Sequence, residues 1–168
     1  MDFLISAIDN LVSWLGRITQ YLVLVMIAVI IFEAAARYIF NAPTQWSYDV
    51  TGWILVAYVF LGGGFAVQQG YLVRVDILFE RMSPKSKALV DLFLSSSLII
   101  LFGGALIWYG GIFAIKSFLT NELSPSGVWN GPVFPAKFMV PLGTSFLLLA
   151  WTSHILQQVK ILFKRDES

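Results

Sequence analysis

One carboxylate, Glu33, lies well inside an apolar stretch, and Arg37 follows it four residues later. On a helix these two side chains share a face and can form an ion pair. A carboxylate inside a membrane can relay protons or cations, or, once neutralised, it can form a polar contact with another polypeptide. Because the neutralising partner stands one turn away, the sequence favours the structural role, in which the pair docks against a second polypeptide.

Few other residues could support catalysis or hold a cofactor. The chain has no cysteine and a single histidine, His154, which argues against thiolate metal sites and a bis-histidine haem held by this chain alone. A lone histidine in an apolar helix more often makes an interhelical hydrogen bond than it carries a proton. The sequence contains no nucleophile elbow, phosphate-binding loop or metal-ligand spacing, so we predict neither an enzyme nor a cofactor.

The composition is typical of a membrane protein. Of the 168 residues, 58% are hydrophobic and 12% are charged, whereas soluble domains carry about 45–50% and about 25%, respectively. The net charge of +1 gives no reason to expect a nucleic acid as partner.

Runs without charged residues mark four membrane spans. The runs 50–73 and 92–115 contain no charged residue, and in 138–159 the only residue that could carry a charge is His154. Each has the roughly 20 residues needed to cross a bilayer core. The earlier run, 18–32, is long enough only if its helix continues through Glu33 and Arg37. We therefore predict an all-α integral membrane protein with one domain, residues 1–168, and spans at approximately 18–40, 49–70, 87–118 and 135–161.

Two further helical segments are expected beside the spans. Apolar residues recur at helical spacing between Phe3 and Leu15, so residues 1–17 form either an amphipathic helix at the membrane surface or an extension of the first span. In the middle loop, residues 77–82 predict a short interfacial helix. Either Thr44 or Ser47 is expected to cap the second span at its N-terminus.

Small residues are concentrated in two of the spans. The run 62–64 in the second span consists of three glycines, and we interpret it as ordinary close packing between helices. In the third span, the glycine pairs 103–104 and 110–111 recur at a spacing of seven, which predicts a smooth stripe for packing against another helix.

The distribution of basic residues predicts the orientation. With four spans, both termini and the middle loop share one side of the membrane. That side holds eight of the eleven Lys and Arg residues, the other three being Arg37, Lys116 and Lys137. Because cytoplasmic loops are enriched in basic residues, both termini are predicted to be cytoplasmic.

Three segments in the first half of the chain follow one another in a recognisable order. They contain Glu33, Arg37, Tyr38 and Asn41; then Trp46, Ser47 and Asp49; then Gly70, Arg74 and Asp76. In this order and spacing they resemble the small membrane subunit of tripartite ATP-independent periplasmic (TRAP) transporters, the DctQ-type small permease component. Two positions depart from the pattern: Asp49 stands where Glu is common, and Tyr71 stands where His is common.

The predicted outer loop, residues 119–134, extends the resemblance toward the fourth span. The matching residues are Ser124, Pro125, Trp129, Asn130, Gly131 and Pro132, followed by Pro135-Ala136-Lys137 and Pro141-Leu142-Gly143. The resemblance therefore covers most of residues 30–145.

The resemblance implies a division of labour among three proteins. A large many-span subunit of the elevator type carries the substrate and sodium sites, and a periplasmic substrate-binding protein delivers an organic acid. The small subunit is then a non-catalytic scaffold in a bacterial or archaeal cytoplasmic membrane, in contact with the large subunit and with membrane lipid. Its outer-loop residues are candidates for contact with a partner, although a loop of this kind could equally pack on its own helices.

Two other classes of protein remain open. A small proton-coupled exporter also has four spans and a carboxylate in the first, but such exporters are shorter and need that carboxylate free to titrate. A membrane anchor of a respiratory complex would normally supply histidine ligands for haem, and a single histidine argues against that form.

Overall fold

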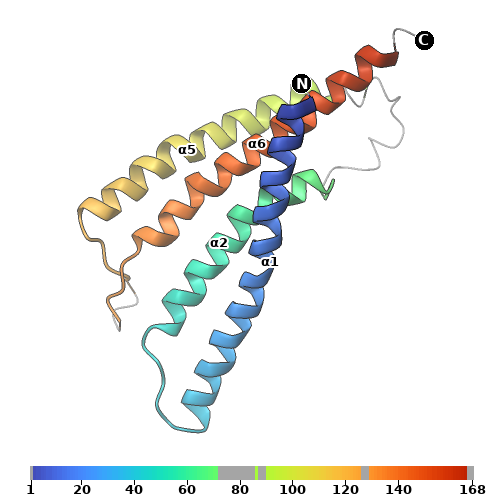
Figure 1. Ribbon diagram of the computed structural model, residues 1–168. Helices are drawn as coiled ribbons and strands as arrows, with labels where there is room; N and C mark the ends of the chain where they lie inside the picture. Colours follow the sequence, from blue (N-terminus) through green and yellow to red (C-terminus); the bar gives the residue numbers. More distant parts are fainter. Residues whose placement is uncertain (1, 72–85, 87–89, 126–128, 166–168) are drawn as a thin grey trace.

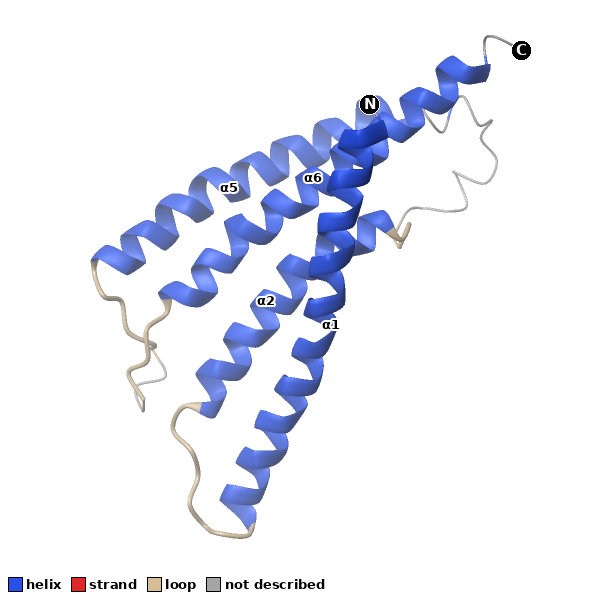
Figure 2. Ribbon diagram, in the orientation of Figure 1, coloured by secondary structure: helices blue, strands red, loops and turns tan. Residues whose placement is uncertain are grey.

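The computed structural model describes residues 2–71, 86, 90–125 and 129–165. Within these ranges the regular elements are all helical (Figure 2). They are α1 (Asp2–Tyr38), α2 (Ser47–Gln68), the π-helical turn η1 (Asp91–Ser95), α5 (Ser96–Leu119) and α6 (Phe134–Arg165). Four helices are long and apolar enough to cross a membrane, which confirms the predicted fold class. The interfacial helix predicted in the middle loop lies outside the described residues.

Helix α1 is one continuous element of 37 residues. The N-terminal segment is therefore an extension of the first span, which is the second of the two arrangements expected from its apolar spacing. At 1.5 Å per residue the helix is about 55 Å long, well beyond a hydrocarbon core of about 30 Å. It must tilt or protrude from the bilayer.

The helices lie side by side in a row rather than around a common axis (Figure 1). Helix α2 packs between α1 and α6, and α5 packs on the other side of α6. Helix α1 diverges from α6 along its length and approaches it where both chain termini lie. We call this the termini end of the row. The opposite end, which carries the α1–α2 loop (residues 39–46) and the α5–α6 loop (residues 120–133), is the loop end.

Glycines set the close contact between α2 and α6. A Cβ atom added at Gly143 would lie 2.4 Å from the backbone carbonyl carbon of Phe60, and one at Gly64 would lie 3.0 Å from the carbonyl oxygen of Phe146. These positions let the two backbones approach each other, as small residues do between membrane helices. Part of the glycine run in α2 is thus explained by packing within this chain.

The glycine stripe predicted on α5 divides into two halves. Gly103 faces the side chain of Leu148, and Gly110 faces Val140 of α6. A Cβ atom at Gly104 or Gly111 would meet nothing within 4 Å. One half of the stripe therefore packs on α6, and the other half borders open space.

A buried cluster holds three helices together at the termini end. It consists of Val12 from α1, Val67 from α2, and Ala150 and Trp151 from α6. Trp151 also fixes α5, because its indole Nε1 donates a buried hydrogen bond of 3.0 Å to the Ser96 hydroxyl. Both apolar and polar contacts therefore hold the helices together at this end of the row.

We predict that Trp151→Phe lowers the free energy of unfolding by at least about 1 kcal/mol, because it removes the donor of the buried bond to Ser96 and part of a buried ring. The matched control is Trp108→Phe on α5, since Trp108 is 68% exposed and its indole faces the surroundings. Apparent midpoints of thermal unfolding in mild detergent would compare the two. Equal shifts would show that the hydrogen bond contributes nothing.

Candidate functional site

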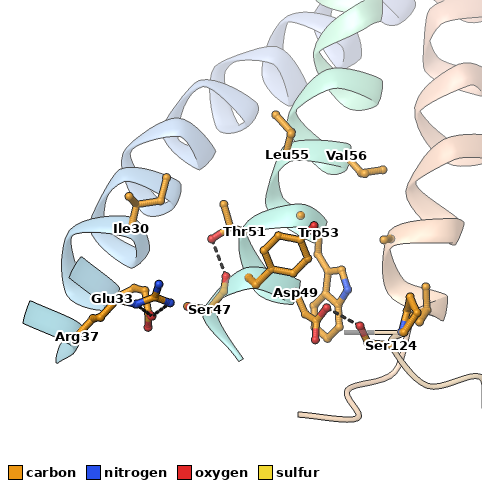
Figure 3. Close-up of a pocket in the computed structure, with 15 residues that line it drawn as sticks. Ile30, Glu33, Arg37, Ser47, Asp49, Thr51, Trp53, Leu55, Val56 and Ser124 are labelled. Carbon is orange, nitrogen blue, oxygen red and sulfur yellow. Dashed lines mark hydrogen bonds and ion pairs between the residues drawn. The ribbon is translucent and has the colours of Figure 1, made fainter. Parts of the chain in front are cut away.

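The predicted site residues that the structure describes gather mainly at the loop end, around the N-terminal turns of α2 (Figure 3). One cluster joins α1 to the α1–α2 loop, and the other joins α2 to the α5–α6 loop. Two residues of the motif, Arg74 and Asp76, lie outside the described residues. Gly70 lies at the other end of α2, where its φ of 74° suits the turn that follows the helix.

Both carboxylate oxygens of Glu33 accept hydrogen bonds. Oε1 accepts from Arg37 Nη2 at 2.7 Å and from Arg37 Nε at 3.1 Å. Oε2 accepts from the backbone N–H of Thr44 at 3.0 Å and also from the Thr44 hydroxyl. Glu33 therefore fastens the α1–α2 loop onto the last turns of α1, in addition to pairing with Arg37.

This arrangement corrects the expected cap of α2. The N-cap residue is Trp46, with no side-chain cap hydrogen bond. Thr44 cannot serve as the cap, because its hydroxyl is engaged by Glu33 in the loop. Ser47 is already the first helical residue, and its carbonyl oxygen accepts from Thr51 Oγ1 at 2.7 Å.

The remaining motif residues shape the end of α1 and the turn after it. Trp46 stacks on Phe32 with a centroid distance of 6.1 Å. Asn41 adopts a φ of 50°, a left-handed conformation that asparagine tolerates better than most residues. Tyr38 is exposed. The stacked rings and the Glu33 bonds together hold the α1–α2 loop in place.

Asp49 anchors the second loop. Its Oδ1 accepts a buried hydrogen bond of 2.6 Å from the Ser124 hydroxyl. The backbone N–H of Ser124 in turn donates to the carbonyl oxygen of Gly131 at 2.8 Å. An acidic residue in the first turn of α2 also suits the positive end of the helix dipole. A carboxylate 75 residues away in sequence from Ser124 thus positions the α5–α6 loop.

The predicted partner-contact residues of this loop divide between inward and outward positions. Ser124 and Gly131 are buried. The centroid of the Trp129 ring lies 5.6 Å from that of the Trp53 ring on α2. Pro125 and Asn130 are exposed and Pro132 is half-buried. Part of the set therefore packs on the chain's own helices, and Pro125 and Asn130 face outward.

Glu122 and Lys137 form an ion pair between this loop and the first turn of α6. The Lys137 ammonium also lies 3.7 Å from the centroid of the Phe113 ring, within range of a cation–π contact. The hydrogen bond from Lys137 holds the pKa of Glu122 below its ordinary value of 4.5. The pair therefore ties α5, the loop and α6 together at the loop end.

We predict that Glu122→Gln flattens the acid dependence of stability. Because the folded pKa of Glu122 lies below its ordinary value, its contribution is complete above pH 4.5 and is lost as the pH falls through the lowered pKa. Glu122 is exposed, so the effect is expected to be small. Midpoints of thermal unfolding measured from neutral to acid pH would reveal it. Identical acid profiles for wild type and variant would contradict the assignment.

A groove crosses α2 at the loop end, between α1 and the α5–α6 loop. Its volume is about 620 Å³ and its lining is mostly apolar. Helix α1 contributes one side, with Ile30, Glu33 and Arg37, and the α5–α6 loop with the first turn of α6 contributes the other. Polar side chains lie near the helix ends, and Leu55 and Val56 lie further along α2 (Figure 3).

Several contacts were not identified from the sequence. At the loop end they include the bonds from Thr44 to Glu33 and from Ser124 to Asp49. Another is a polar network at the termini end. There Asp9 accepts from Ser153 Oγ at 2.6 Å and from Gln157 Nε2 at 3.0 Å, and its carbonyl accepts from Gln68 Nε2 at 2.9 Å. The sequence signal that could have predicted this network is Asp9 itself, an acidic residue among apolar ones in a segment that extends the first span.

His154 is placed on α6 at the termini end, with its ring 5.2 Å from that of Trp151. Among the described residues, no group of three or more His, Cys, Asp or Glu side chains is placed to hold a metal ion. The carboxylates of Glu33 and Asp49 both accept hydrogen bonds from the loops that they hold. The arrangement therefore positions two loops and lines one groove.

A family model described as "Tripartite ATP-independent periplasmic transporters, DctQ component" matches residues 26–161. The matched range contains both loop-end clusters and the groove. A search of curated proteins finds no match to the sequence.

Proposed function

The chain belongs to the DctQ family, the small membrane components of TRAP transporters, and we propose that it is a non-catalytic scaffold subunit. In this role it packs beside the large many-span subunit and enlarges the stationary part of the transporter. The finer proposal is sodium-coupled import of an organic acid that a periplasmic binding protein delivers. We further propose a cytoplasmic-membrane location with both termini cytoplasmic, in agreement with the distribution of basic residues.

The observation that carries the scaffold proposal is the single row of helices. A row leaves broad apolar faces that other membrane helices or lipid must cover. On α5, large side chains such as Leu101, Phe102 and Trp108 are exposed. Gly104 and Gly111 on the same helix border open space, and small residues of this kind allow close approach of a neighbouring helix.

The bonding of Glu33 supports a structural role over a transport role. A carboxylate that relays protons must gain and lose a proton during each cycle. Both oxygens of Glu33 are instead engaged by Arg37 and by the α1–α2 loop. This geometry disfavours the small-exporter alternative, which needs Glu33 free to titrate.

The exposed part of the α5–α6 loop is the proposed contact for the periplasmic binding protein or for the outer surface of the large subunit. Pro125, which also lines the groove, and Asn130 are exposed there, on a loop that Asp49 and Lys137 contact. Contacts of this kind lower the ordering cost that neighbouring exposed residues pay on binding.

Purification of the tagged chain from its native membrane in mild detergent, followed by mass spectrometry, tests the scaffold proposal. We expect recovery of one much larger, many-span membrane protein in near-stoichiometric amount. Recovery of this chain alone, as a homo-oligomer, would overturn the proposal. Proton-coupled efflux by the purified chain that Glu33→Gln abolishes would then establish the exporter.

A further inference from the structure

The groove at the loop end changes in polarity along the helix axes. Arg37 stands in the last turn of α1, and Ile30 is seven residues earlier, or about 10 Å deeper along the helix. On α2, Ser47 begins the helix and Leu55 lies about 12 Å further in. The polar part of the groove therefore lies near the ends of two spans, where headgroups are found, and its apolar part reaches toward the hydrocarbon core.

The accessible charge of the groove is positive. Three charged side chains line it: Glu33, Arg37 and Asp49. Asp49 is buried, and the side chain of Glu33 is 15% exposed, whereas that of Arg37 is 56% exposed. Arg37 donates to Glu33 through Nε and Nη2, and a guanidinium has five N–H donors in total. The Arg37 guanidinium can therefore donate hydrogen bonds to an anion from outside the chain while it still donates to Glu33.

The size and lining of the groove select the kind of occupant. A volume of about 620 Å³ is in the range of small-molecule sites, which span about 300–1,000 Å³. The aromatic rings of Tyr48 and Trp53 also line the groove, and amphipathic rings of this kind favour the headgroup level.

From these observations we propose that the groove binds one phospholipid from the surrounding leaflet. The phosphate contacts the exposed edge of Arg37, and an acyl chain lies beside Ile30 and Leu55. Charge complementarity between guanidinium and phosphate supplies the headgroup contact. The bound lipid lies over α2, between α1 and the α5–α6 loop.

Native mass spectrometry on the full chain, delipidated in mild detergent, provides the test. The probe is dioleoyl phosphatidylglycerol, and dioleoylglycerol, which has the same chains without the phosphate, is the comparison. We expect one phosphatidylglycerol per chain, bound roughly tenfold more tightly than dioleoylglycerol. Equal binding of the two lipids would overturn the assigned phosphate contact.

Two glycine variants test the location. A Cβ atom at Gly52, in the groove, and one at Gly104, on α5, would both meet nothing within 4 Å. Gly52→Leu fills the groove without a clash at its first side-chain atom, and we expect it to weaken phosphatidylglycerol binding roughly tenfold. Gly104→Leu adds the same side chain elsewhere and should leave the affinity unchanged. Wild-type affinity in Gly52→Leu, or equal losses in both variants, would overturn the site.

Two further measurements test the headgroup contact and the identity of the occupant. Arg37→Gln should remove the preference for phosphatidylglycerol over dioleoylglycerol, and a retained preference would overturn the role of Arg37. A photo-crosslinking residue placed at position 52 in native membranes should give a lipid adduct. A polypeptide adduct alone would overturn the proposal and identify a protein as the occupant.

Discussion

Gly143→Ala should be among the most destabilising single-methyl changes in this chain, with a loss of about 3 kcal/mol. The added Cβ atom would lie 2.4 Å from the carbonyl carbon of Phe60 and 2.5 Å from its oxygen. These are backbone atoms, so no side-chain rotation can relieve the clash, and α2 and α6 must move apart. Overpacking of this kind typically costs about 1–3 kcal/mol, and contact with backbone places Gly143 at the upper end.

Two other glycines give the change a graded control. At Gly64 an added Cβ atom would lie 3.0 Å from the carbonyl oxygen of Phe146, so Gly64→Ala should cost less than Gly143→Ala. At Gly104 it would meet nothing within 4 Å, and alanine gains up to about 1 kcal/mol in helix propensity. Apparent midpoints of thermal unfolding in detergent should therefore fall from Gly104→Ala, the highest, through wild type and Gly64→Ala to Gly143→Ala, the lowest.

An unchanged midpoint for Gly143→Ala would mean that α2 and α6 do not touch at this position. The result would bear on the whole row, because α6 contacts each of the other three long helices. A loss of similar size for Gly104→Ala would instead point to a general cost of changing glycines in these helices.

The helices were predictable from the sequence because their signal is local. Long uncharged runs must form helices in a membrane, where backbone groups have no water to bind. The same local signal could not decide whether residues 1–17 continue the first span. Nor could it place the π-helical turn Asp91–Ser95.

The loop-end site was only partly predictable, for a related reason. The pair Glu33–Arg37 follows from helical spacing alone. The bonds from Thr44 to Glu33 and from Ser124 to Asp49 join positions 11 and 75 residues apart. A single sequence states that these residues are polar, but not which of them meet. Hence either Thr44 or Ser47 was expected to cap α2, whereas Thr44 binds the carboxylate of α1 instead.

The hydrogen bonds between Glu33 and Thr44 lead to the second prediction. We expect Glu33→Ala to release the α1–α2 loop more than Arg37→Ala does. Removing Glu33 leaves the Thr44 N–H and the Arg37 guanidinium without the acceptor that each now uses. A hydrogen bond to a charged group is stronger than one between neutral groups, so we expect at least about tenfold faster exchange of the Thr44 amide hydrogen in Glu33→Ala. Removing Arg37 keeps the Thr44 bonds and breaks only a half-exposed ion pair, which contributes little.

Hydrogen exchange at Thr44 and co-purification of the large subunit separate fastening from docking. We expect both variants to weaken assembly more than changes at Asp2 or Asp166, and Glu33→Ala to weaken it more than Arg37→Ala. Equal recovery of the large subunit with all four variants would contradict the docking role. Faster exchange in Glu33→Ala would, independently of that result, establish that Glu33 holds the α1–α2 loop. Equal exchange in Glu33→Ala and Arg37→Ala would mean that the ion pair holds the loop, because only the pair is lost in both.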